Sequence, residues 1–122
     1  MLYRLKSNES TEQELAEEIS FLISALKKIA PDDICQVYIF GSASLGVSAM
    51  HQYSDIDLCL IVRNDLDLKI FRRKVPVSRK IPVDWIIIHE AEFTEKSRAS
   101  SGVYAVIARE GKSLWKAGAT AG

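Results

Sequence analysis

Hydrophobic positions near the start of the chain recur with a helical period. Between residues 10 and 31, apolar residues recur at helical intervals at Leu15, Ile19, Leu22, Ile23 and Leu26. This spacing predicts one amphipathic helix, with Thr11 and Glu14 at capping-box spacing near its start and Pro31 ending it. We expect its apolar stripe to pack on a sheet and its acidic face to be solvated. The side chains expected on the exposed face are Glu12, Glu14, Glu17, Glu18 and Lys27.

Three continuous apolar runs predict strands, at residues 34–40, from 56 to about 63, and 83–88. The middle run is apolar on both faces beyond its aspartates, which is typical of a central strand covered on each side. Residues 66–74 and 101–110 are expected to form short helices, the second closed by Gly111. Residues 90–96 are expected to be a linker or helical turn, and 112–115 an edge strand. These elements predict an α/β fold with a small mixed sheet flanked by helices.

Length and composition predict an ordinary globular domain. The 122 residues are 48% hydrophobic and 26% charged, with a formal net charge of zero. We expect a single domain over residues 1–122, with a flexible lead-in at 1–9 and a flexible tail at 117–122. The neutral balance argues against a fold built to grip nucleic acid. The absence of a secretion signal or long apolar run predicts a cytoplasmic protein without a membrane partner.

Polar residues cluster where the first two predicted strands meet. The first apolar run ends in Gly41-Ser42, and Asp55 and Asp57 open the second. Because strand side chains alternate, both aspartates point to one face. At about 5 Å and an effective dielectric of about 20, two ionised carboxylates repel by roughly 3 kcal/mol. A cation is therefore expected between them, and Mg²⁺ is the natural candidate.

The Gly41-Ser42 turn could bind an anion. Glycine lets the backbone approach a phosphate, turn amides form an anion-binding concavity, and the serine hydroxyl is a rotatable donor. Residues 43–50 could add a short helix that directs its N-terminus at the phosphate. Taken singly, Gly-Ser is also a common turn and Asp-x-Asp a common cap. His51 has no visible partner and is left out of the site.

Asp84 interrupts the third apolar run. A lone buried charge there would be costly, so Asp84 needs a partner or an open site. The alternative without a functional role is that Asp84 lies at an exposed strand start or pairs with a nearby arginine. Asp65 and Asp67 repeat the Asp-x-Asp letters after the second strand, where we assign them to helix capping.

Six basic residues and no acidic ones lie between residues 69 and 80. They are Lys69, Arg72, Arg73, Lys74, Arg79 and Lys80. The segment is either a solvated helix and loop, a source of contacts to a triphosphate or pyrophosphate, or a docking patch for an acidic partner. Cys35 and Cys59 have no CxxC spacing, and we interpret them as buried, reduced thiols with a structural role.

The chain resembles the nucleotidyltransferase superfamily of DNA polymerase β type. The pattern is an apolar residue, Gly-Ser, a twelve-residue spacer (residues 43–54) and Asp-x-Asp, and the resemblance extends over residues 37–115. It is most similar to the minimal nucleotidyltransferases, which often act as antitoxins of HEPN-domain toxins. Leu45 and Val47 stand where relatives often carry an arginine and an acidic or hydroxyl residue. That departure affects an arginine contact and leaves the carboxylate pattern unchanged.

The resemblance implies a palm-like fold and a role for each polar residue. Asp55, Asp57 and Asp84 would form a catalytic triad that binds Mg²⁺. Asp84 would complete a second metal site or accept the proton of the attacking hydroxyl. Gly41 and Ser42 would hold the β and γ phosphates of a nucleoside triphosphate, with ATP as donor.

By the same resemblance, the leading hypothesis is an antitoxin that transfers AMP from ATP to a hydroxyl of a partner HEPN toxin. The catalytic module accounts for almost all of this chain, so a separate macromolecule is expected to present that hydroxyl. One alternative is a binding module that neutralises its partner by occlusion. Another is a stand-alone enzyme acting on a small alcohol or aminoglycoside. Base preference is open, and a homo-oligomer is compatible with the sequence.

Overall fold

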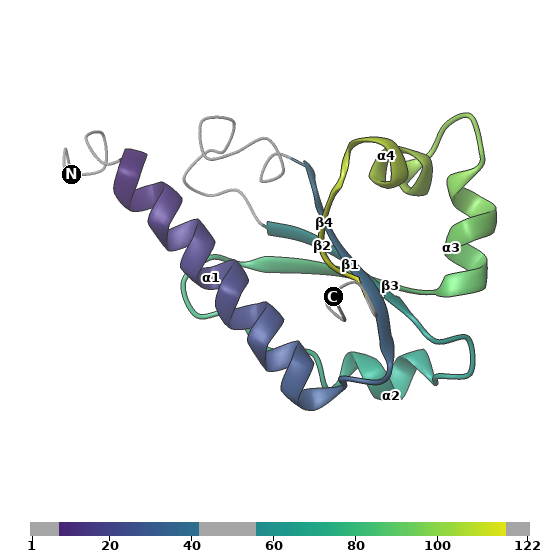
Figure 1. The fold of residues 1–122 in the computed structure, drawn as a ribbon, viewed down its shortest axis with the longest axis horizontal. Coiled ribbons are helices and arrows are strands. Elements are labelled where there is room, and N and C mark those ends of the chain that lie inside the picture. The colour runs from purple at the N-terminus through teal and green to yellow at the C-terminus, as the bar shows by residue number, and fades with distance from the viewer. Residues whose placement is uncertain (1–7, 42–55, 117–122) are drawn as a thin grey trace.

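The computed structural model describes residues 8–41 and 56–116, and its elements match the predicted α/β pattern (Figure 1). The helices are α1 (Asn8–Ile29), α2 (Leu68–Arg72), α3 (Glu90–Ser97) and α4 (Val103–Glu110). The strands are β1 (Ile34–Phe40), β2 (Ile56–Val62), β3 (Val83–His89) and β4 (Lys112–Lys116). The expected mixed sheet flanked by helices is confirmed. The predictions for residues 43–50 and for the tail fall outside the described ranges.

The sheet has the strand order β3-β2-β1-β4. β1 pairs antiparallel with both β2 and β4, whereas β2 and β3 are parallel. The parallel pair requires a crossover that returns the chain to the same end of the sheet, and α2 with the following loop makes that connection. Every residue of β2 except Asp57 is buried. The predicted central strand is therefore confirmed.

The four helices cover the two faces of the sheet in pairs. Figure 1 shows α1 and α2 on one side of the strands and α3 and α4 on the other. Leu58 and Leu60 of β2 belong to the core clusters that α1 and α2 complete. Cys59 and Ile61 belong to a separate cluster with Phe93 of α3 and residues of α4. Alternate side chains of β2 thus enter different cores, as the period of a strand requires.

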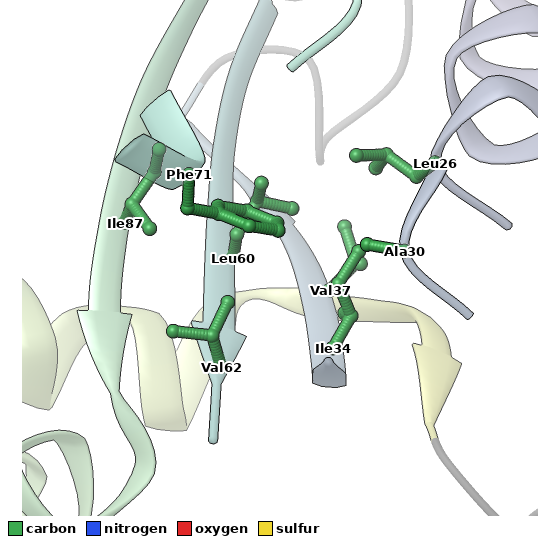
Figure 2. Close-up of a cluster of buried hydrophobic side chains, with 8 residues drawn as sticks. All are labelled: Leu26, Ala30, Ile34, Val37, Leu60, Val62, Phe71 and Ile87. Carbon is green, nitrogen blue, oxygen red and sulfur yellow. The ribbon is translucent and has the colours of Figure 1, made fainter. Parts of the chain in front are cut away.

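Figure 2 shows the cluster in which α1 and α2 meet the sheet. Its members come from both helices and from three strands: Leu26, Ala30, Ile34, Val37, Leu60, Val62, Phe71 and Ile87. Phe71 is 3% exposed, and Leu68 on the same face of α2 is partly buried against the cluster. A five-residue helix is too short to be stable alone. α2 is therefore held by this packing and by its cap.

Of the second Asp-x-Asp, Asp67 caps a helix as predicted, whereas Asp65 does not. Asp67 Oδ1 accepts hydrogen bonds from the amides of Lys69 and Ile70 at the start of α2, at 2.9 and 3.3 Å. Asn64, just before it, accepts from the Ala91 amide at 2.8 Å and so caps α3. Asp65 lies 3.7 Å from Arg63 in an exposed ion pair. Asn64 and Asp67 therefore cap the helices that follow β2 and β3.

Two sequence expectations about α1 need correction. The helix begins at Asn8, inside the expected lead-in. Glu18 is fully buried instead of solvent-exposed, because backbone amides of a distant loop supply its hydrogen bonds. The other acidic residues described on this face, Glu14 and Glu17, are exposed as predicted.

Gly111 ends α4 as predicted, but for a different reason from the usual left-handed cap. Its φ is −70°. A Cβ at this position would lie 2.7 Å from the Ile107 carbonyl oxygen and 3.3 Å from that of Ile39. The tight end of α4 and its close approach to β1 therefore require glycine, which has no side chain, at this position.

We expect Phe71→Ala to lower the free energy of unfolding by about 3 to 5 kcal/mol, because it removes a buried ring and leaves a cavity. Ile70→Ala on the same short helix is the matched control, since Ile70 is 53% exposed. The control should change stability by less than about 1 kcal/mol. Urea unfolding followed by circular dichroism measures both. Equal effects of the two variants would contradict the placement of Phe71 in the core.

Candidate functional site

Asp57 and Asp84 lie side by side at one end of the sheet. They are direct partners in the parallel pairing of β2 and β3. Asp84 is exposed and Asp57 is partly buried. Cys59 and Ile86, each two residues further along its strand, pack in the α3 and α4 core. Because alternate residues share a face, both carboxylates are placed on that side of the sheet, beyond its apolar core.

Gly41 places the end of β1 directly against Asp57. The preceding residue, Phe40, pairs with Asp57 across β1 and β2. Gly41 has a φ of +72°, a left-handed conformation that favours glycine. A Cβ at Gly41 would overlap the Oδ2 atom of the Asp57 carboxylate. The bend at Gly41, which we expected to bind phosphate, therefore also leaves space for the Asp57 carboxylate.

The donor set at this end of the sheet suits a divalent cation. Neighbouring strands are about 4.8 Å apart, so partner residues on one face bring their side chains close together. Two carboxylates at that spacing repel each other and supply the oxygen ligands that Mg²⁺ prefers. Asp55 and Ser42 lie outside the described residues. Within the described ranges there is no group of three or more His, Cys, Asp or Glu side chains placed to hold a metal.

The cysteines do not add a thiolate to this site. Cys59 lies two residues after Asp57 on the same face of β2, and burial raises the pKa of its thiol to about 12. Cys35 is partly buried. Burial, followed by the Glu90 carboxylate 3.7 Å from its sulfur, raises the pKa of Cys35 from its ordinary value of 9.0. Both thiols therefore stay protonated at neutral pH.

We expect iodoacetamide at pH 8 to leave Cys59 of the folded protein unmodified and to alkylate Cys35 more slowly than a free thiol. The thiolate is the reactive form, and a raised pKa shifts its appearance to higher pH. The Cys35 rate should therefore keep rising above pH 9, whereas in denaturant both cysteines should react at the free-thiol rate. Mass spectrometry of the digested protein measures each rate. Rapid modification of folded Cys59 would contradict its burial.

Four of the six basic residues in the 69–80 segment lie far from the carboxylates. Lys69, Arg72, Arg73 and Lys74 are exposed on α2 or directly after it. Phe71 fixes α2 on the cluster that contains Val62, at the opposite end of β2 from Asp57. Val62 is five positions along β2 from Asp57, which is about 16 Å at about 3.3 Å per residue. These four cations are therefore not placed to bind a phosphate held at Asp57.

The remaining two basic residues of the segment, Arg79 and Lys80, lie in the loop before β3 and contact α1. Glu18 accepts hydrogen bonds from the amides of Arg79 and Lys80, at 2.6 and 3.3 Å. The Arg79 guanidinium stacks over the Phe21 ring, 4.0 Å from its centroid. This contact holds the Arg79 side chain on the α1 side of the sheet, away from the face of Asp57 and Asp84.

We expected Glu18 on the solvated face because glutamate is usually exposed, although its position along the helix indicates burial. Residue 18 follows Leu15 by three and precedes Leu22 by four, so it lies on the buried stripe of α1. A charged residue on that stripe was the available signal.

Comparison with known proteins places these residues in a family context. The family model described as a nucleotidyltransferase domain matches residues 19–108. A crystal structure of a proposed nucleotidyltransferase from Sulfolobus solfataricus superposes with a TM-score of 0.62 and 21% sequence identity. The match covers 92% of this chain and 89% of that one, and at this identity it shows a shared fold. No curated protein gives a significant match. None of the described helices is long and apolar enough to cross a membrane.

Proposed function

Because this chain belongs to the nucleotidyltransferase domain family, we propose that it transfers AMP from ATP to a hydroxyl group of a partner protein. The observation that carries the proposal is the pairing of Asp57 with Asp84, with Gly41 turned against Asp57. Phosphoryl-type transfers need positioned charge more than covalent chemistry from the protein. Two adjacent carboxylates beside a tight bend suit that need.

Each residue has a proposed role in the transfer. Asp55 and Asp57 would hold Mg²⁺ together with the triphosphate, and Asp84 would complete a second metal site or take the proton of the attacking hydroxyl. Bound divalent ions would neutralise the negative charge on the phosphate oxygens. Gly41 and Ser42 would hold the β and γ phosphates. The acceptor oxygen then bonds to the α phosphorus, the bond to the bridging oxygen of pyrophosphate breaks, and pyrophosphate leaves.

The proposed acceptor is a hydroxyl, by resemblance a tyrosine, on a HEPN-type toxin. The resemblance to minimal nucleotidyltransferases supports this choice. The α2 surface also supports a protein partner, because the exposed residues Lys69, Arg72, Arg73 and Lys74 lie within four positions of Ile70, which is 53% exposed. Exposed cations beside an exposed aliphatic side chain fit an acidic partner surface with an apolar residue at its centre. The surface has no described aromatic side chain on which bases could stack.

A labelling experiment tests the reaction. The protein is incubated with Mg²⁺, ATP and a HEPN protein encoded beside it that carries an Arg-x-x-x-x-His motif. Label from ATP carrying ³²P at the α position should appear on the partner, and label from the γ position should not. Intact protein that transfers no α label would contradict the proposal. Label from the γ position would indicate phosphoryl transfer instead.

The same system separates catalysis from occlusion. In the double variant Asp55→Asn, Asp57→Asn, the proposal predicts that binding to the partner persists while labelling and neutralisation are lost. Full neutralisation by this variant would show that occlusion carries the function. Charge reversal of Arg72 and Arg73 to glutamate should instead weaken partner binding and leave binding of Mg²⁺ and ATP unchanged. Unchanged partner binding would remove the α2 surface from the proposal.

A further inference from the structure

The structure assigns to Glu18 the role of a positioning residue for the carboxylate pair, an inference that rests on the proposed function of Asp57 and Asp84. Among the side chains that the structure describes, Glu18 is the only charged one that is fully buried. It occupies a position on the apolar stripe of α1 where leucine would satisfy packing. Replacing buried ionic groups by apolar residues of similar size is often neutral or stabilising. Packing alone therefore does not account for the carboxylate.

The Glu18 carboxylate is held entirely by the segment that leads into β3. Oε2 accepts from the Arg79 amide at 2.6 Å, and Oε1 accepts from the Lys80 amide at 3.3 Å. The Arg79 Nε atom lies 3.9 Å from Oε1, and its guanidinium stacks on Phe21, one helical turn after Glu18. Main chain and side chain of Arg79 are thus both anchored on α1. We call residues 18, 21, 79 and 80 the α1 clamp.

The α1 clamp continues directly into the pairing that aligns the two aspartates. The Pro82 carbonyl, two residues after Lys80, accepts from the Ile56 amide at 2.8 Å. Ile56 then pairs with Val83, and the next pair is Asp57 with Asp84. Ile81 and Val83 pack in the cluster built on Leu15 and Leu22 of α1. Only the four residues 80–83 therefore connect the anchored Arg79 to Asp84, and they are tied to α1 and to β2.

The start of β3 depends on this anchor because it is an edge. Among the described strands, β3 has a neighbour on one side only, and Asp84 itself is exposed. The far half of β3 has other supports, since Ile87 and Ile88 are buried and His89 Nε2 lies 2.7 Å from the Leu66 carbonyl oxygen. Without the α1 clamp, the half that carries Asp84 would be held only by backbone pairing to β2 and by the partly buried side chains of Ile81 and Val83. Glu18 thus fixes where the Asp84 carboxylate stands relative to that of Asp57.

Two variants and one control test this role. Glu18→Leu fits the apolar stripe but accepts no hydrogen bond. Glu18→Gln keeps the size and one acceptor oxygen. Glu17→Gln is the control, because Glu17 is the exposed neighbour that accepts only from Gln13 at 3.2 Å among the described contacts. Thermal unfolding identifies any variant that fails to fold, and Glu18→Gln remains informative if Glu18→Leu does.

Two readouts separate positioning from stability. The first is hydrogen exchange of the Arg79, Lys80 and Ile56 amides by NMR. The second is the affinity for Mn²⁺ alone, measured by water-proton relaxation. We expect Glu18→Leu to lose protection at all three amides and to weaken Mn²⁺ binding about 10-fold or more, as for outer-shell residues of metal sites. Glu18→Gln should show smaller losses of both, and Glu17→Gln should match the unmodified protein.

The outcomes distinguish failure of this inference from failure of the proposed function. Unchanged Ile56 protection in Glu18→Leu, or unchanged Mn²⁺ affinity despite lost protection, would overturn the positioning role. If the unmodified protein does not bind Mn²⁺, the proposed metal site is wrong. In that case, hydrogen exchange of the Ile56 amide would still test whether the α1 clamp aligns β3 with β2.

Discussion

Asp84→Asn is expected to reduce nucleotidyl transfer by about 10²- to 10³-fold while the protein stays folded. The substitution removes one of the carboxylates proposed to hold the divalent ions that neutralise the reacting phosphates, and lost electrostatic stabilisation of this kind has effects of that size. Asp84 is exposed at the start of an edge strand and asparagine has the same shape. The free energy of unfolding should therefore change by less than about 0.5 kcal/mol. Initial rates of α-labelled AMP incorporation, together with urea unfolding, measure the two quantities.

Asp65→Asn is the matched control for this prediction. Asp65 belongs to the second Asp-x-Asp, is exposed, and makes only a 3.7 Å ion pair with Arg63 among the described contacts. The rate should remain within about twofold of the unmodified protein, because surface ion pairs contribute little. Equal losses in Asp65→Asn and Asp84→Asn would argue against a special role for the pairing of Asp57 with Asp84.

Gly41→Ala is expected to damage both the fold and the site. An alanine in the left-handed region costs about 1 to 2 kcal/mol, and Gly41 has a φ of +72°. Its methyl group would also overlap Oδ2 of Asp57, so the bend or the carboxylate must move. A displacement of about 1 Å can lower a rate about 10²-fold. Transfer rates normalised to the folded fraction measure the loss at the site separately from the loss of stability.

Gly102→Ala is the matched control for Gly41→Ala, because it introduces backbone strain without a collision with Asp57. Gly102 has a φ of +108° at the start of α4, and a Cβ there would meet nothing within 4 Å. We expect a loss of stability from backbone strain alone, with transfer per folded molecule unchanged. If Gly41→Ala kept its transfer rate per folded molecule, the contact of Gly41 with Asp57 would have no catalytic consequence.

Local patterns were sufficient for most of the elements. The bounds of β1 are those predicted, because the apolar run ends sharply at a turn on each side. α2 is shorter than predicted, since Asp67 caps it and Arg73 ends it. The 90–96 segment, left open as a linker or a helical turn, forms the helix α3. In these cases the deciding interactions lie within a few residues of one another along the chain.

The sequence by itself determined that three aspartates and a Gly-Ser bend stand at the ends of apolar runs, because side-chain alternation and turn chemistry are local properties. Only the tertiary structure decided that Asp84 pairs with Asp57, since strand order and register depend on a crossover and on packing across 27 positions. The same holds for Glu18, whose burial depends on amides more than sixty residues away. Helical period places residue 18 on the inner face, but only the folded chain brings the donors that let a carboxylate stay there.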